Sequence, residues 1–163
     1  MIGDRELISP IFRIVKGIVI DTLILTEDLL TGIPEIDQDH QQLLVDLNAF
    51  DPQIIFCSSK KDQIKVLSNL YVHCAGHFIR EEILMREVKY PYTSSHSSIH
   101  DEALKTLKTF IFLFYEEQDF KKESTLSSVR DMVQDWIVPH IREEDKIFAN
   151  YYLSSKSKSK NSS

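Results

Sequence analysis

The stretch from residue 73 to residue 85, HCAGHFIREEILM, places His73, His77 and Glu81 four residues apart. On an α-helix, residues i and i+4 lie on the same face, so these three side chains would point to one side. The apolar residues around them recur at steps of three and four, at Leu67, Leu70, Cys74, Leu84 and Val88. His77 and Glu81 fall on these core steps, whereas His73 lies one residue off them. We therefore expect a helix over residues 62–89 that carries His77 and Glu81 into a core.

Three further segments show the same helical period, from about residue 37, from about residue 95, and from about residue 124 to 152. Each carries histidine on its apolar side: His40 in the first, His96 and His100 in the second, and His140 in the third. Four amphipathic helices with short connections predict an all-α fold, an antiparallel up-down-up-down four-helix bundle. We expect an N-terminal extension and arm over residues 1–32, the bundle over 33–152, and a disordered basic tail over 153–163.

Composition narrows the functions that such a bundle can have. A chain of 163 residues is one domain, and its net charge of −6 argues against a nucleic-acid partner. The two cysteines, Cys57 and Cys74, form no disulfide framework and suit a reducing compartment, so we expect a cytoplasmic protein. The apolar residues 11–25 include three charged side chains, Arg13, Lys16 and Asp21. They therefore predict neither a membrane helix nor a signal peptide.

Five of the six histidines face a core that should be almost wholly hydrocarbon: His40, His77, His96, His100 and His140. One buried histidine usually finds a carbonyl or carboxylate partner, but five from four helices cannot all do so cheaply. A shared metal satisfies them together, because neutral imidazole is the commonest metal ligand. Five imidazoles with carboxylates exceed what one metal uses, and this mixture in a bundle favours a pair of irons over a structural zinc.

The carboxylate of the fourth helix is harder to choose. From His140, the i+4 rule selects Glu144, and Asp145 at i+5 lies further round the helix. Pro139 removes a backbone hydrogen bond beside His140 and can distort the helix there. The residues alone leave Glu143, Glu144 and Asp145 open.

Four motifs together resemble the hemerythrin family, in the family's order: GIPEIDQDHQQL at 32–43, HFIREEILM at 77–85, YPYTSSHSSIH at 90–100 and WIVPHIREEDKIF at 136–148. The resemblance covers about residues 25 to 152. It implies a di-iron centre in which three histidines bind one iron, namely His96, His100 and His140. It also implies that His40 and His77 bind the other iron, and that Glu81, Asp145 and an oxo or hydroxo group bridge the two.

The same resemblance implies reversible dioxygen binding at an open position on the two-histidine iron. Five apolar residues would enclose that position: Phe78, Ile99, Trp136, Ile137 and Ile141. We expect an oxygen carrier, storage or delivery protein rather than an enzyme. The alternatives are an oxygen or redox sensor and a di-iron enzyme acting on peroxide, nitric oxide or ferrous iron, for which His73 would be the proton donor. A homo-oligomer or another protein partner is left open.

The chain departs from the family pattern in places that carry no ligand. Leu25 stands where the family usually has a tryptophan, and residues 1–22 have no counterpart in its short members. Asp51 and Pro52 fall where the first helix normally continues, so we expect a kink or a fresh start there, with Asp51 as the cap and Pro52 in the first turn. His73 stands where family members more often carry an aromatic residue.

Overall fold

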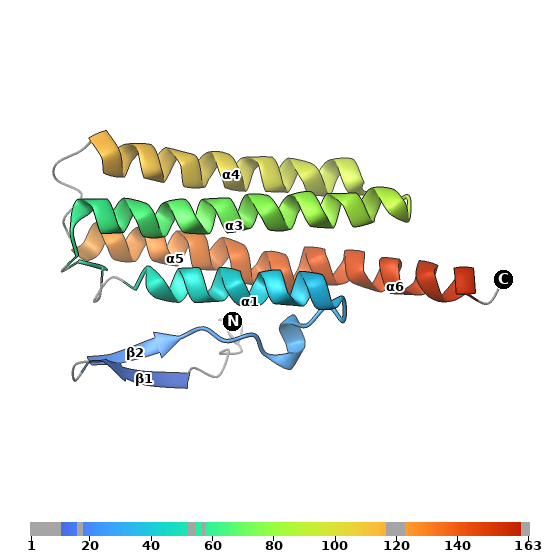
Figure 1. Cartoon of the computed structure of the whole chain (residues 1–163), viewed down its shortest axis with the longest axis horizontal. Coiled ribbons are helices and arrows are strands. Elements are labelled where there is room, and N and C mark those ends of the chain that lie inside the picture. Colours follow the sequence, from blue (N-terminus) through green and yellow to red (C-terminus); the bar gives the residue numbers. More distant parts are fainter. Residues whose placement is uncertain (1–10, 16–17, 52–54, 57, 117–122, 161–163) are drawn as a thin grey trace, which may run out of the picture.

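The structure is a computed structural model that describes residues 11–15, 18–51, 55–56, 58–116 and 123–160. Four long helical segments lie side by side and alternate in direction (Figure 1). They are α1 (Pro34–Ala49), α3 (Lys60–Glu87), α4 (Thr93–Glu116), and a fourth built from α5 (Glu123–His140), η2 (Ile141–Asp145) and α6 (Lys146–Lys160). The predicted antiparallel four-helix bundle is confirmed. Among the described helices, none is long and apolar enough to cross a membrane.

Local sequence explains where the first two helices begin. Pro34 occupies the first turn of α1, where its missing N–H would have no helical partner. The Asp37 carboxylate accepts hydrogen bonds from the Thr31 amide at 2.7 Å and the Gly32 amide at 3.1 Å. At the start of α3, the Ser59 hydroxyl accepts a hydrogen bond from the amide of Asp62 at 3.1 Å. These side-chain acceptors satisfy backbone donors at the points where the chain enters each helix.

Two apolar clusters fill the bundle. The larger includes Leu43, Leu44, Leu67, Leu70, Leu107 and Val133. The smaller contains Ile33, Ile36, Met85, Tyr90, Phe148 and Ala149. On α1, His40 lies between Ile36 of the smaller cluster and Leu43 of the larger one. A polar layer therefore separates two hydrocarbon layers, and these fix the level at which the histidines meet.

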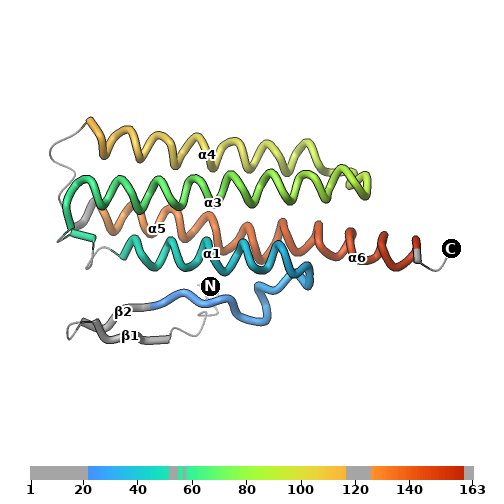
Figure 2. Tube along the Cα trace, viewed as in Figure 1, coloured from blue at the N-terminus to red at the C-terminus, as the bar shows by residue number. Residues whose placement is uncertain are grey.

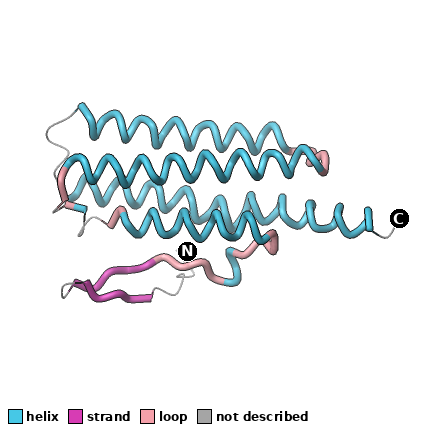
Figure 3. Tube along the Cα trace, viewed as in Figure 1, coloured by secondary structure: helices cyan, strands magenta, loops and turns pink. Residues whose placement is uncertain are grey.

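The N-terminal arm contains a hairpin that the sequence interpretation did not predict. Strand β1 (Ile11–Val15) pairs antiparallel with β2 (Ile18–Thr22), and a short 3₁₀ helix, η1 (Glu27–Leu29), follows (Figure 3). The Asn48 side chain on α1 accepts a hydrogen bond from the Leu23 amide at 2.9 Å and donates one to its carbonyl at 2.7 Å. Leu25 packs against the larger apolar cluster. The arm is thus held against α1.

The prediction of a disordered tail is wrong for residues 153–160, which continue α6 through Lys160 (Figure 2). Extending an existing helix needs only propagation, without the unfavourable nucleation step. Lys156 also forms an ion pair with Glu87 of α3, and its ammonium group lies 5.4 Å from the centre of the Tyr152 ring. Residues 161–163 lie outside the described residues.

The loop after α1 agrees in part with its prediction. The carbonyl of Asp51 accepts a hydrogen bond from the amide of Ile55 at 2.8 Å, the spacing of a helical turn. Pro52, predicted in the first turn, lies outside the described residues.

Of the two glycines among the described residues, Gly32 should matter more for stability. Its φ of +79° lies in the left-handed region, where an added Cβ costs about 1–2 kcal/mol. We expect Gly32→Ala to lower the free energy of unfolding by about 1 kcal/mol, measured by urea denaturation. Gly76 inside α3 is the matched control, since a Cβ there would meet only the end of the Arg80 side chain, at 3.4 Å. Gly76→Ala should leave stability equal or higher, and equal losses in both variants would show that the left-handed backbone at Gly32 is not the cause.

Candidate metal centre

Seven buried titratable side chains meet in the polar layer, and each is at most 6% exposed. Every helical segment of the bundle contributes at least one of them. They are His40 from α1, His77 and Glu81 from α3, His96 and His100 from α4, His140 at the end of α5, and Asp145 at the end of η2. The structure thus brings together all seven residues that the family resemblance implied as metal ligands.

One group contains three histidines and two carboxylates: Glu81, His96, His100, His140 and Asp145. Their potential ligand atoms lie within 4.8 Å of one another. His96 Nε2 and His100 Nε2 lie 3.2 and 3.3 Å from Glu81 Oε2. His140 Nε2 lies 2.9 Å from Asp145 Oδ1. These nitrogens and oxygens converge on one point, as the ligands of a single ion would.

A second group contains His40, His77 and again Asp145. His40 Nε2 lies 3.0 Å from Asp145 Oδ2, and His77 Nε2 lies 3.7 Å from the same oxygen. Asp145 therefore turns one oxygen to each group. Glu81 is less evenly placed, because its Oε2 lies 4.0 Å from His77 Nε2 but closer to the rings of the three-histidine group.

A π-helical turn explains why Asp145 reaches the centre. Residues Ile141–Asp145 form this wider turn, directly after His140. In a π-helix the bonding interval is five residues, so i and i+5 lie on a common face, as i and i+4 nearly do in an α-helix. Glu144, which the α-helical rule selects, is only half-buried and lies outside both groups. Pro139, which lacks an amide donor, immediately precedes His140 and is the local signal for this irregularity.

The carboxylates of Glu81 and Asp145 give the centre a negative electrostatic potential. Burial alone would raise the pKa of Asp145, but the imidazoles of His140, His40 and His77 hold it well below its usual value. Burial likewise opposes ionisation of Glu81, yet His100 and His96 keep its pKa lowered.

The pKa values of two histidines shift in the opposite direction. Burial would lower the pKa of His77, but Asp145, Asp39 and Glu81 raise this pKa to about 10. The pKa of His96 rises in the same way to about 9. The carboxylates thus favour positive charge on their neighbours, whether carried by protons or by metal.

Two carboxylates outside the cluster contact the outer nitrogens of two histidines, and sequence reasoning missed them. Asp39 Oδ2 lies 3.7 Å from His77 Nδ1, and Glu82 Oε1 lies 3.3 Å from His100 Nδ1. Each is also paired with an arginine, Asp39 with Arg80 and Glu82 with Arg86. A signal existed, because ligating histidines commonly donate their second N–H to a carboxylate, and each of these two residues is adjacent to a predicted ligand in sequence.

Two of the five apolar residues predicted around the dioxygen site stack on histidine rings of the centre. The Phe78 ring stacks on His100 with ring centres 3.9 Å apart, and Trp136 stacks on His140 at 4.9 Å. Both of these stacked contacts are with the three-histidine group, although Phe78 also lies 5.3 Å from His77. Ile137 and Ile141 are buried and Ile99 is half-buried. Enclosure of a dioxygen site by these residues stays a prediction.

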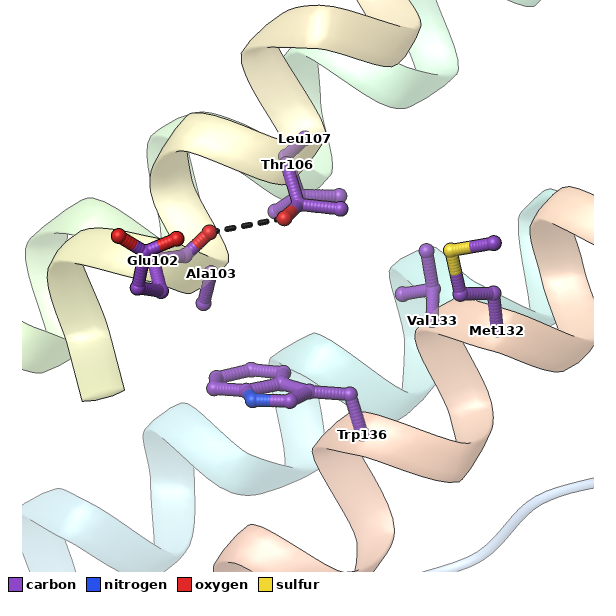
Figure 4. A pocket seen from close by; sticks show the side chains of 7 residues that line it. All are labelled: Glu102, Ala103, Thr106, Leu107, Met132, Val133 and Trp136. Atoms are coloured by element: carbon purple, nitrogen blue, oxygen red, sulfur yellow. Dashed lines mark hydrogen bonds between the residues drawn. The ribbon is translucent and has the colours of Figure 1, made fainter.

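An apolar cavity of about 210 Å³ lies between α4 and α5 (Figure 4). Its lining includes Ala103, Leu107, Val133 and Trp136. Trp136 is the one member of the predicted wall in this lining, and its ring also stacks on His140. Through the Trp136 side chain, the cavity borders the three-histidine group.

His73 lies outside both groups, as its helix phase predicts. Its side chain is 42% exposed, and its Nδ1 is hydrogen-bonded to Asp46 of α1. Gln42 donates a second hydrogen bond to Asp46 at 3.2 Å. His73 therefore joins α1 to α3 and contributes no atom to the cluster.

Comparison with known proteins agrees with this geometry. The model of the family described as "Hemerythrin HHE cation binding domain" matches residues 31–152. A bacteriohemerythrin of Stenotrophomonas maltophilia is 28% identical over 129 residues, which cover 78% of this chain and 80% of that protein. One of Campylobacter jejuni is 33% identical over 87 residues, 53% of this chain and 62% of its own.

Solved structures give the same result for the fold. The crystal structure of a leucine-to-phenylalanine mutant superposes with a TM-score of 0.64 at 22% identity, covering 75% of this chain and 89% of that one. Because the family model matches residues 31–152, which include all of the bundle except the end of α6 and every motif that supplies the buried cluster, the chain belongs to the hemerythrin family.

Proposed function

We propose that this chain holds two non-haem irons and binds dioxygen reversibly as a carrier or store. The observation that carries the proposal is the arrangement of seven buried side chains in two groups that share Asp145. The relatives named bacteriohemerythrin support the choice of iron and dioxygen.

The donor atoms fit a metal pair. Several buried atoms of the cluster have no hydrogen-bond partner among the described residues: His77 Nε2, His96 Nε2, Asp145 Oδ1 and both carboxylate oxygens of Glu81. A buried polar atom without a partner costs about 1–3 kcal/mol. Metal ions would coordinate these atoms together and remove that cost.

We assign His96, His100 and His140 to one iron, and His40 and His77 to the other. Asp145 supports this division because its two oxygens face different groups. We assign Glu81 as the second bridge, since its carboxylate lies between His96 and His77. An oxo or hydroxo group would complete the pair.

The two groups differ in the number of imidazoles, and we assign the dioxygen position to the group with fewer. When bound, the irons would supply the electrons for reversible dioxygen binding. The chain's own contribution is to hold the ligands and to exclude water, since both groups are buried between apolar layers. An enzyme at this site would use His73 as its predicted proton donor, and the hydrogen bond of His73 to Asp46, outside the cluster, favours binding over turnover.

Anaerobic loading with ferrous iron tests this function. We expect two irons per chain by metal analysis, and a visible absorption band that appears with dioxygen and disappears on its removal over several cycles. Asp145→Ala should lose most of the iron because Asp145 contacts both groups, whereas Glu144→Ala should keep two irons. One iron per chain, exclusive zinc binding, or irreversible oxidation in the first cycle would contradict the proposal.

The metal-free protein should lose stability as pH rises. The pKa values of His77 and His96 are raised to about 10 and 9 in the folded protein, above the ordinary value of about 6.5. Their contribution to folding is therefore complete below about pH 6.5 and is lost as pH rises toward 9 and 10. We expect the melting temperature of the metal-free protein to fall over this range. His77→Ala should flatten the fall, His73→Ala should not, and a melting temperature that rises over this range would argue against the charge assignment.

A further inference from the structure

The Asp39 carboxylate approaches the metal centre from outside, across the interface of α1 and α3. Its Oδ2 lies 3.7 Å from Nδ1 of His77, the ring nitrogen turned away from the centre. Arg80 of α3 donates from Nε to Oδ2 at 2.6 Å and from Nη2 to Oδ1 at 2.5 Å. Such a two-point contact fixes the plane and position of a carboxylate.

Glu82 makes a closer contact of the same kind on the other group, within hydrogen-bond distance. Its Oε1 lies 3.3 Å from Nδ1 of His100, and Arg86 donates to its Oε2 at 2.8 Å. His100 Nε2 meanwhile faces Glu81 and His140 in the centre. Nδ1 of His40, of His77 and of His96 is in each case buried with no hydrogen-bond partner among the described residues, but at His77 the Asp39 carboxylate faces this nitrogen from 3.7 Å, just beyond hydrogen-bond distance. Each group therefore contains one histidine whose outer nitrogen faces a carboxylate and one that lacks such a contact.

We propose that Asp39 with Arg80, and Glu82 with Arg86, are two positioning pairs that set the metal affinity of the two-histidine group and the three-histidine group, respectively. The inference rests on the proposed metal pair. A carboxylate on Nδ1 fixes the tautomer that leaves Nε2 free for the metal, orients the ring, and makes the imidazole a stronger donor. The arginine holds each carboxylate in place and offsets part of its charge.

A purely structural role is the competing explanation, because the Asp39–Arg80 pair also joins α1 to α3. The two roles differ in what they require. If the pair only links the two helices, removing Asp39 or removing Arg80 should have the same effect on metal binding. If the pair positions His77, the carboxylate of Asp39 is the group that matters. Asp39→Ala should therefore weaken metal binding more than Arg80→Met does.

Titration of the metal-free full-length chain with Co²⁺, followed by visible absorption and chelator competition, tests the proposal without dioxygen. We expect two binding steps for the wild type. Asp39→Ala should weaken one step and Glu82→Ala the other, each by about 10- to 100-fold. In a His40→Ala background, which disables the two-histidine group, the remaining step should respond to Glu82→Ala and not to Asp39→Ala.

Glu87→Ala is the matched control, since Glu87 is an α3 carboxylate paired with a cation, Lys156, but belongs to neither ligand group. It should leave both steps unchanged. Two wild-type steps that neither Asp39→Ala nor Glu82→Ala alters would overturn the positioning pairs and leave the proposed function intact. Equal weakening of both steps by both variants would also overturn them, in favour of a structural role. A wild-type chain that binds fewer than two Co²⁺ ions would overturn the metal pair and this inference together.

Discussion

Burial of Glu81 and Asp145 beside five imidazoles is the constraint on which the rest of the structure depends. Neither carboxylate has measurable exposure, and charge in such a site is tolerated only when opposite charge lies close by. Each helical segment must therefore present its histidine at one level of the bundle. The two apolar clusters on either side of that level supply the burial energy that holds the segments in this register.

The helical period predicted most of the site because burial and ligation use the same face. His40, His77, His96 and His100 lie on regular helices, where the steps that identify the core also identify the ligands. The helical period does not identify Asp145 as a ligand, because the π-helical turn adds one residue to the spacing. Pro139 indicates that the helix is irregular there, but it does not indicate which kind of turn forms. The choice of Asp145 over Glu144 came from family resemblance alone.

The ends of the chain were predicted less well than its middle. A hairpin such as β1–β2 gains little from its own two strands, so its formation depends on contacts that composition does not reveal. The polar composition of residues 153–160 suggested disorder, whereas α6 extends through them. The arm also has a connection to the site. Arg142 and Lys146, at the π-helical turn, donate to the side chain and carbonyl of Asp28, so the arm contacts the segment that places Asp145.

The central claim is that one carboxylate is shared by two metals with unequal sets of histidines. Diffraction from crystals of the iron-loaded protein at the iron absorption edge tests it most directly. We predict two anomalous peaks about 3–4 Å apart, a separation usual for paired metals, with Asp145 between them. One peak should lie beside His96, His100 and His140, and the other beside His40 and His77. A single peak, or a pair of peaks bridged by Glu144 in place of Asp145, would contradict the claim.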